Sequence, residues 1–309
     1  MKLGWRSIEL GGVTQWVSLR GRPDAPALVM LHGGPGGSEF GPRRKYLRDL
    51  ERDWLVVEWD QRGAGRTFRG DEDATTLTFE RLVLDGIALL GWLHGETRER
   101  VILVGHSFGT ALGVRVAQRA PSQIAAYVGV GQIVNWTLQE ERGYDWVLAE
   151  ARRRNHTKAI AALEALGRPI DGTYAIGPRG TEIQRRWLGT FGGVTKDPSF
   201  LLSWILSTLT CGDYPLGAKL RHMKAMRRSM ELLWTDLART IDFMKDAVRF
   251  DVPVHLFTGR TDHITDVEQI EAWHAALTAP TKRLEIAEAG HMCQYEEPAH
   301  FRRFLDGAL

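Results

Sequence analysis

The amino-acid sequence predicts an α/β fold, in which a mostly parallel sheet is flanked by helices and carries an inserted helical cap. Short apolar runs typical of buried strands alternate with segments of helical spacing over residues 1–131 and again over residues 246–309. Residues 132–245 show helical patterns only. We therefore expect a core made of residues 1–131 and 246–309, with a cap, or lid, made of residues 132–245.

The expected sheet has eight strands. Two alternating segments, WRSIEL and TQWVSL, are joined by Gly11-Gly12 and predict a β-hairpin. Helical spacing follows over residues 77–94, and a second helix, TALGVRVAQRAP, is expected to stop at Pro121. Five of the six remaining strands are predicted by the apolar runs ALVMLHGG, WLVVEWD, RVILVGHS, AAYVGVG and VPVHLFTG, and KRLEIAEA is expected to be the last strand.

The charge balance excludes some partner classes. The 309 residues include 40 Lys and Arg against 38 Asp and Glu, which gives a net charge of +2. This balance provides no electrostatic reason to expect nucleic acid or an anionic membrane as partner. The run FLLSWILSTL, residues 200–209, is about half as long as a bilayer span requires, so it predicts a buried or cavity-lining helix.

The cysteines and the first residues favour a cytoplasmic protein. Cys211 and Cys293 are far apart and show no metal-ligand spacing, so we expect two free thiols in a reducing compartment. The segment MKLGWRSIEL lacks the apolar region of a signal peptide. We expect no metal and no organic cofactor, and a small molecule or a short peptide as the substrate. The oligomeric state is left open.

Ser107 is the strongest candidate for a catalytic nucleophile. It lies in VILVGHSFG, where a predicted strand meets a predicted helix, and fits the pattern G-x-S-x-G. In this pattern the serine occupies a tight, strained turn, so the residues two positions away must be small. Gly105 and Gly109 meet that requirement. The N–H groups at the start of the following helix favour developing negative charge.

The glycine-rich stretch LHGGPGG, residues 31–37, follows the third predicted strand and predicts an oxyanion hole. Two backbone N–H groups, those of Gly34 and Phe108, are the expected donors, each lowering the barrier by about 3 kcal/mol. Glycines let the backbone approach a substrate closely, and proline stiffens the turn. The residues that we expect to contact the substrate are Gly33, Pro35, His106 and Trp204.

Asp262 and His291 are the candidates that would complete a catalytic triad. Asp262 lies in FTGRTDHITD and His291 in AEAGHMCQYEEP, each directly after a predicted strand. The chain order Ser, Asp, His is the order expected for this arrangement. Asp266 is the alternative carboxylate, but it lies farther from the end of its strand.

Five motifs together carry a family resemblance: HGGPGG, DQRGAGRT, GHSFGT, GRTDHITD and GHMCQYEEP. With them, the chain resembles the proline iminopeptidase branch of the α/β-hydrolase superfamily. The resemblance implies the α/β-hydrolase fold, a triad of Ser107, Asp262 and His291, and a serine hydrolase that removes N-terminal proline or cleaves related amides through an acyl-enzyme. It also implies a structural DQRG turn near the site, with Arg62 bonding loop carbonyls or carboxylates.

An aminopeptidase has to bind a free α-ammonium group, which requires buried or half-buried carboxylates, because an unpaired buried cation is costly. We expect them on the cap, where spacing does not choose between the candidates. These are Glu140, Glu141, Glu150, Glu182 and Glu231.

Two other functions remain open at the level of sequence. The turn around Ser107 has the sequence G-H-S-F-G, which is the form common in ester hydrolases, whereas iminopeptidases usually have G-G-S-W-G. An esterase, lactonase or thioesterase acting on a hydrophobic small molecule, for example in secondary metabolism, is therefore the first alternative. The second is a ligand receptor or a catalyst of cyclisation or C–C bond chemistry on the same fold. Epoxide hydrolases and haloalkane dehalogenases are disfavoured, because both usually carry Asp where Ser107 stands.

Overall fold

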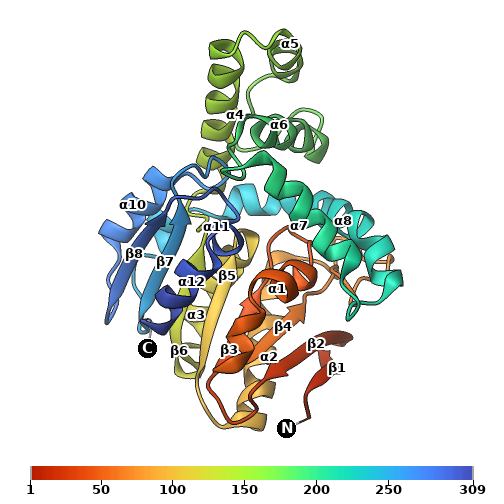
Figure 1. Ribbon diagram of the computed structural model, residues 1–309, viewed down its shortest axis with the longest axis vertical. Helices are drawn as coiled ribbons and strands as arrows, with labels where there is room; N and C mark the ends of the chain where they lie inside the picture. Colours follow the sequence, from red (N-terminus) through yellow and green to blue (C-terminus); the bar gives the residue numbers. More distant parts are fainter. Residues whose placement is uncertain (1, 308–309) are drawn as a thin grey trace.

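The computed structural model describes residues 2–307, which form one eight-stranded sheet with helices on both faces (Figure 1). Its spatial order is β1-β2-β4-β3-β5-β6-β7-β8. The strands are β1 (Gly4–Leu10), β2 (Val13–Gly21), β3 (Ala27–Leu31), β4 (Leu55–Asp60), β5 (Val101–His106), β6 (Ile124–Val130), β7 (Val254–Gly259) and β8 (Lys282–Ala287).

The prediction of a mostly parallel sheet is confirmed. β1 pairs with β2 and β2 with β4 in antiparallel fashion, and every other neighbouring pair is parallel. The predicted hairpin turns at Gly11 and Gly12, whose φ angles are 55° and 78°. β3, β4, β5 and β7 are buried along their whole length, as their continuous apolar runs require. Parallel strands end at a common edge, and the loops that carry the predicted site residues follow β3, β5, β7 and β8.

The helices cover the sheet in two layers. One apolar cluster includes Trp59 and Trp273, and the cluster on the opposite face includes Phe257 and Phe301. The helices are α1 (Phe40–Tyr46), α2 (Phe79–Thr97), α3 (Phe108–Arg119), α4 (Trp136–Arg153), α5 (Thr157–Leu166), α6 (Pro178–Phe191), α7 (Pro198–Thr210), α8 (Leu216–Thr240), α9 (Phe243–Asp246), α10 (Val267–Ala276), α11 (Cys293–Glu296) and α12 (Pro298–Asp306), with short 3-10 turns η1 (Arg48–Arg52) and η2 (Pro121–Gln123).

Helices α4 to α9 lie between β6 and β7 in the chain. In Figure 1, α4, α5 and α6 stand above the sheet, while α7 and α8 lie lower and to the right, where α7 contacts α1. α4, α5 and α6 share an apolar cluster of their own, which contains Trp187 and Leu188. We refer to α4 to α8 as the inserted helices.

The expectation of burial for the run FLLSWILSTL is wrong for four of its residues. Leu202, Ile205, Leu206 and Leu209 are exposed. The physical reason is that α7 packs on the rest of the molecule through one face only, so its opposite face meets solvent. Trp204, on the packed side, lines a cavity, in line with the cavity-lining alternative.

The described residues contain two free thiols, Cys211 and Cys293, as expected from their spacing. Residues 2–307 hold no group of three or more His, Cys, Asp or Glu side chains arranged to bind a metal ion. Over the same residues, every helix is too short or too polar to cross a bilayer.

Candidate active site

Ser107 occupies the strained turn that its motif predicts. Its backbone angles are φ 53° and ψ −122°, between the end of β5 and the start of α3. A Cβ atom on Gly109 would lie 2.4 Å from the carbonyl oxygen of Leu31, and one on Gly105 would lie 2.4 Å from the carbonyl oxygen of Gly109. The turn therefore needs glycine at both positions. The Ser107 N–H is anchored on the carbonyl of Val130, at 3.0 Å.

His291 and Asp262 meet although they come from loops after different strands. Nδ1 of His291 lies 2.8 Å from Oδ2 of Asp262. Oδ1 accepts the N–H groups of Ile264 and Thr265 at 2.8 and 2.9 Å, and the Thr265 hydroxyl donates to Oδ2 at 2.5 Å. Burial alone would raise the pKa of Asp262, but His291 and these hydrogen bonds hold that pKa below its ordinary value. Asp262 is therefore an ionised acceptor that fixes the orientation of the His291 ring.

Asp266, the alternative carboxylate, serves a different purpose. It is the N-cap of α10, where Oδ1 accepts the N–H of Glu268, and Oδ2 pairs with Arg142. Both of its oxygens are thus engaged away from His291. Between the two carboxylates, the geometry favours Asp262 as the partner of His291.

The loop after β3 is held from two sides. The Gly33 N–H donates to Oε1 of Glu39 at 2.9 Å. His32 lies 2.8 Å from the Gly33 carbonyl through Nδ1, and Nε2 accepts the N–H of Gln61 at 3.3 Å. Burial lowers the pKa of His32 to about 4, so the ring is neutral and donates from Nδ1. Gly34 follows with φ 117°, and within residues 2–307 its N–H has no hydrogen-bond partner.

Phe108, the second expected oxyanion donor, is the first residue of α3. Its ring is buried against Phe79, with centroids 6.3 Å apart. The N–H groups in the first turn of a helix lack acceptors within that helix, so the Phe108 N–H is free for another partner. Arg62 of the DQRG turn pairs with Asp85 at 2.8 Å and reaches the carbonyls of Leu10 and Gly11, in line with the role that the family resemblance implies.

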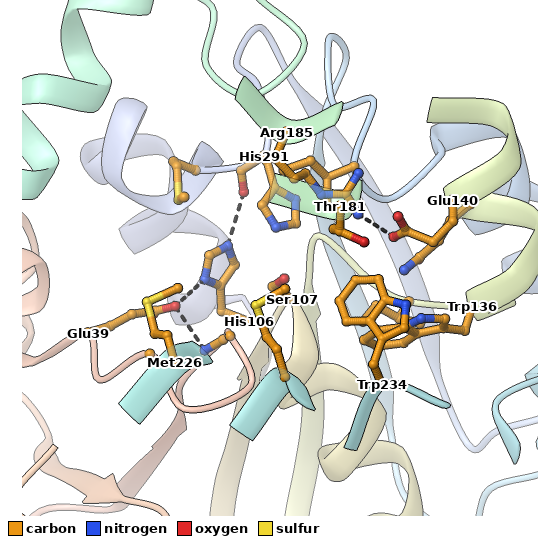
Figure 2. Close-up of a pocket in the computed structure, with 18 of the residues that line it drawn as sticks. Glu39, His106, Ser107, Trp136, Glu140, Thr181, Arg185, Met226, Trp234 and His291 are labelled. Atoms are coloured by element: carbon orange, nitrogen blue, oxygen red, sulfur yellow. Dashed lines mark hydrogen bonds and ion pairs between the residues drawn. The ribbon is translucent and has the colours of Figure 1, made fainter. Parts of the chain in front are cut away.

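A cavity of about 230 Å³ adjoins Ser107 and His291 (Figure 2). Of the four residues predicted to contact substrate, Gly33, His106 and Trp204 line this cavity, whereas Pro35 does not. The remaining apolar lining comes largely from the inserted helices and the segment that leads into them: Ile133, Trp136, Met226, Met230 and Trp234.

Glu140 is the one predicted cap carboxylate that lines the cavity. It is fully buried; Arg185 donates to Oε1, and Oε2 has no hydrogen-bond partner in the described part of the chain. Burial raises the pKa of Glu140, and Arg185 offsets the rise only in part. The other four candidates do not line the cavity. They form ion pairs elsewhere: Glu141 with Arg168, Glu150 with Arg153 and Arg154, Glu182 with Arg227, and Glu231 with Arg228.

Sequence reasoning missed four polar residues of this cavity, one of which is Gln139 of α4. Thr181 and Arg185 come from α6, on the same side as Glu140 in Figure 2, and Glu39 lies on the other side beside His106. The only signal for Glu39 was an acidic residue within an otherwise small and apolar stretch, GGPGGSEF. Nothing in the local sequence distinguishes Thr181 or Arg185 from other polar residues of a helix.

Comparison with known proteins fits this geometry. Residues 28–302 match the alpha/beta hydrolase family, so the chain belongs to that family and is a hydrolase. It is 28% identical to "Probable aminopeptidase YbaC" of Bacillus subtilis, over 97% of this chain and 94% of that protein. It is 25% identical to "Putative carbamate hydrolase RutD" of Cronobacter sakazakii, over 93% of this chain and 91% of that protein.

A solved structure shows the same fold. The proline iminopeptidase-related protein TTHA1809 from Thermus thermophilus aligns with a TM-score of 0.69 and 22% identity, covering 100% of this chain and 98% of that one. The resemblance found in the motifs is thereby confirmed for the fold and the family.

Proposed function

We propose that this protein is a serine hydrolase in which Ser107, His291 and Asp262 act as a triad. With Nδ1 bonded to Asp262, His291 presents Nε2 as the general base. Nε2 takes the Ser107 proton as Oγ attacks the substrate carbonyl carbon. The leaving group then departs with that proton, and water activated by His291 hydrolyses the acyl-enzyme. The N–H groups of Gly34 and Phe108 hold the oxyanion in both steps.

We further propose an N-terminal proline residue, or a related amide with a free amine, as the substrate. The observation that carries this proposal is the free carboxylate oxygen of Glu140 in the cavity wall. Gln139 Oε1 and Thr181 Oγ1, also in the wall, lack partners within the described residues. An N-terminal proline carries a secondary ammonium group with two N–H donors, which unpaired oxygens can accept, and a buried, incompletely compensated carboxylate is stabilised by a cation.

The apolar wall supports a compact, apolar residue beside that amine. Trp136 and Trp234 pack edge to face, with centroids 4.9 Å apart, and both line the cavity. A pyrrolidine ring against these indoles would bury apolar surface, which is favourable at about 25 cal/mol per Å².

The test compares three substrates on the wild-type enzyme: prolyl p-nitroanilide, N-acetyl-prolyl p-nitroanilide and a p-nitrophenyl ester of a short acid. We expect the enzyme to turn over prolyl p-nitroanilide and to cleave the N-acetylated anilide much more slowly, because acetylation removes the charge that Glu140 would bind. Equal rates for the free and the blocked anilide would remove the aminopeptidase assignment. Loss of fluorophosphonate labelling in Ser107→Ala tests the nucleophile separately, and an unlabelled wild type would contradict the triad.

Esterase, lactonase or thioesterase activity on a hydrophobic small molecule is the second candidate. Arg185 already neutralises one oxygen of Glu140, and most of the surface that lines the cavity is apolar. Turnover of the ester alone would favour this candidate.

A further inference from the structure

Glu39 is a buried carboxylate at the centre of the site that the proposed mechanism does not use. It directly precedes α1, and its side chain is almost fully inaccessible. Oε1 accepts the Gly33 N–H at 2.9 Å and lies 2.7 Å from Nδ1 of His106. Oε2 accepts Arg43 at 3.2 Å and the Tyr295 hydroxyl at 2.8 Å. Burial opposes its ionisation, but His106 and Arg43 hold the pKa of Glu39 well below its ordinary value.

His106 connects Glu39 to His291, the proposed base. Its Nε2 lies 3.1 Å from the backbone carbonyl oxygen of His291, and the two rings are 5.0 Å apart between centroids. A carboxylate oxygen and a carbonyl oxygen both accept hydrogen bonds, so each ring nitrogen of His106 faces an acceptor: Nδ1 faces Glu39 and Nε2 faces the His291 carbonyl. Hydrogen bonds of this charge-assisted kind are about twice as strong as neutral ones.

The contacts join the three loops that the proposed mechanism requires. Gly33 belongs to the loop after β3, which carries the expected oxyanion donor. His106 is the last residue of β5 and directly precedes the nucleophile turn, and His291 lies in the loop after β8. Figure 2 shows the dashed contacts from Glu39 to His106 and from His106 to His291, and the Gly33 N–H donates to the same carboxylate. Tyr295, in α11, ties the segment after His291 to the same carboxylate.

We propose that Glu39 and His106 form a positioning bridge. This bridge holds the loop after β3, which carries the expected oxyanion donor Gly34, and the loop that carries His291 in fixed positions relative to Ser107. The proposal rests on the function proposed above, because it assigns these residues a role in that reaction. It also differs from the sequence-based expectation that His106 contacts the substrate. Both ring nitrogens of His106 are engaged by the protein, which leaves the ring no free polar atom for a ligand.

The experiment uses His106→Phe, Glu39→Gln and the double variant in the full-length enzyme. The first measurement is the rate at which a small fluorophosphonate labels Ser107, which requires nucleophile, base and oxyanion hole but not the amine subsite. We expect a fall of about 10- to 100-fold in this rate and in kcat, with KM little changed, because small misplacements of reacting groups cost up to about 100-fold. The double variant should fall no further than the worse single variant, since both break one bridge.

The matched control is His300→Phe. His300 also bonds a glutamate, Glu285, but this pair lies between α12 and β8 and does not line the cavity. Wild-type labelling is expected for it. Circular dichroism and thermal unfolding establish which variants are folded. If His106→Phe does not fold, the labelling rate of the nearly isosteric variant Glu39→Gln tests the bridge.

Wild-type labelling rates in a folded His106→Phe or Glu39→Gln enzyme would overturn the bridge while leaving the triad intact. A raised KM with unchanged labelling would also overturn it and would return His106 to the role of a substrate contact. A wild-type enzyme that is not labelled at all would be a different failure, because it contradicts the proposed nucleophile and the bridge with it.

Discussion

The carboxylate of Asp262 orients the ring of His291: Oδ2 lies 2.8 Å from Nδ1, and two backbone N–H groups and one hydroxyl hold the carboxylate in place. The two residues are 29 positions apart and follow adjacent strands, β7 and β8. An imidazole fixed in this way keeps its Nδ1 proton and leaves Nε2 free to act as a base.

Asp262→Asn should therefore preserve the fold and abolish most of the activity. An amide can donate to Nδ1 and stabilise the wrong tautomer of His291, and in the serine-protease template this change lowers kcat by about 10⁴. The measurement is kcat on the best substrate of the panel, with circular dichroism as the fold control. A folded variant within tenfold of wild type would show that Asp262 does not serve His291 in the reaction.

Glu140→Gln tests the proposed ammonium site. With the charge removed, kcat/KM on prolyl p-nitroanilide should fall at least about tenfold, which corresponds to about 1.4 kcal/mol, while turnover of a neutral ester should change little. Glu141→Gln is the control, because the neighbouring Glu141 pairs with Arg168 and does not line the cavity. Equal losses in the two variants, or on the two substrates, would argue against recognition of an amine by Glu140.

Gly109→Ala should destabilise the nucleophile turn. The added Cβ would lie 2.4 Å from the Leu31 carbonyl oxygen, so the backbone has to shift, at a cost of about 1–3 kcal/mol in the free energy of unfolding. Gly91→Ala in α2 is the matched control, since a Cβ there meets nothing within 4 Å. Alanine has the higher helix propensity, so Gly91→Ala should stabilise the protein by up to about 1 kcal/mol. Urea denaturation of both variants checks the pair, and equal stability would refute the packing argument.

Glu58 should make the protein less stable as the pH rises. Burial in β4 raises the pKa of this side chain from 4.5 to about 8, although Arg43 works against the rise. Between these two pH values the folded chain holds a proton that the unfolded chain has lost, so the free energy of unfolding decreases over that range. Glu58→Gln removes this dependence, and above pH 8 it should be more stable than wild type by a few kcal/mol at most, since each pKa unit is worth about 1.4 kcal/mol.

The check on Glu58 is thermal unfolding at about pH 5 and about pH 9. The variant and the wild type should be similar at the lower pH, where the wild-type carboxyl is protonated in the folded state, and should separate at the higher one. A variant that is destabilised equally at both values would show that Glu58 is held ionised by the surrounding arginines.

Local sequence patterns were sufficient to predict the fold and to select Ser107, Asp262 and His291 as candidate site residues. The runs that form β3 to β7 are apolar because strands inside the sheet are buried on both faces. The turn at Ser107 can be recognised because it needs glycine two residues away on each side. Asp262 and His291 could be selected because parallel strands deliver the loops after them to one edge of the sheet. None of these inferences depends on how distant segments pack.

Tertiary structure decided the rest. Five cap carboxylates were equivalent in the sequence, and only the packing of α4 against α6 brings Glu140 to Arg185, 45 residues away, and into the cavity. Packing likewise leaves one face of α7 in solvent and joins Glu39 to His106 across 67 residues. The periodicity of a sequence reports which face of an element is apolar, but the partner of a buried charge is set by which segments meet in three dimensions.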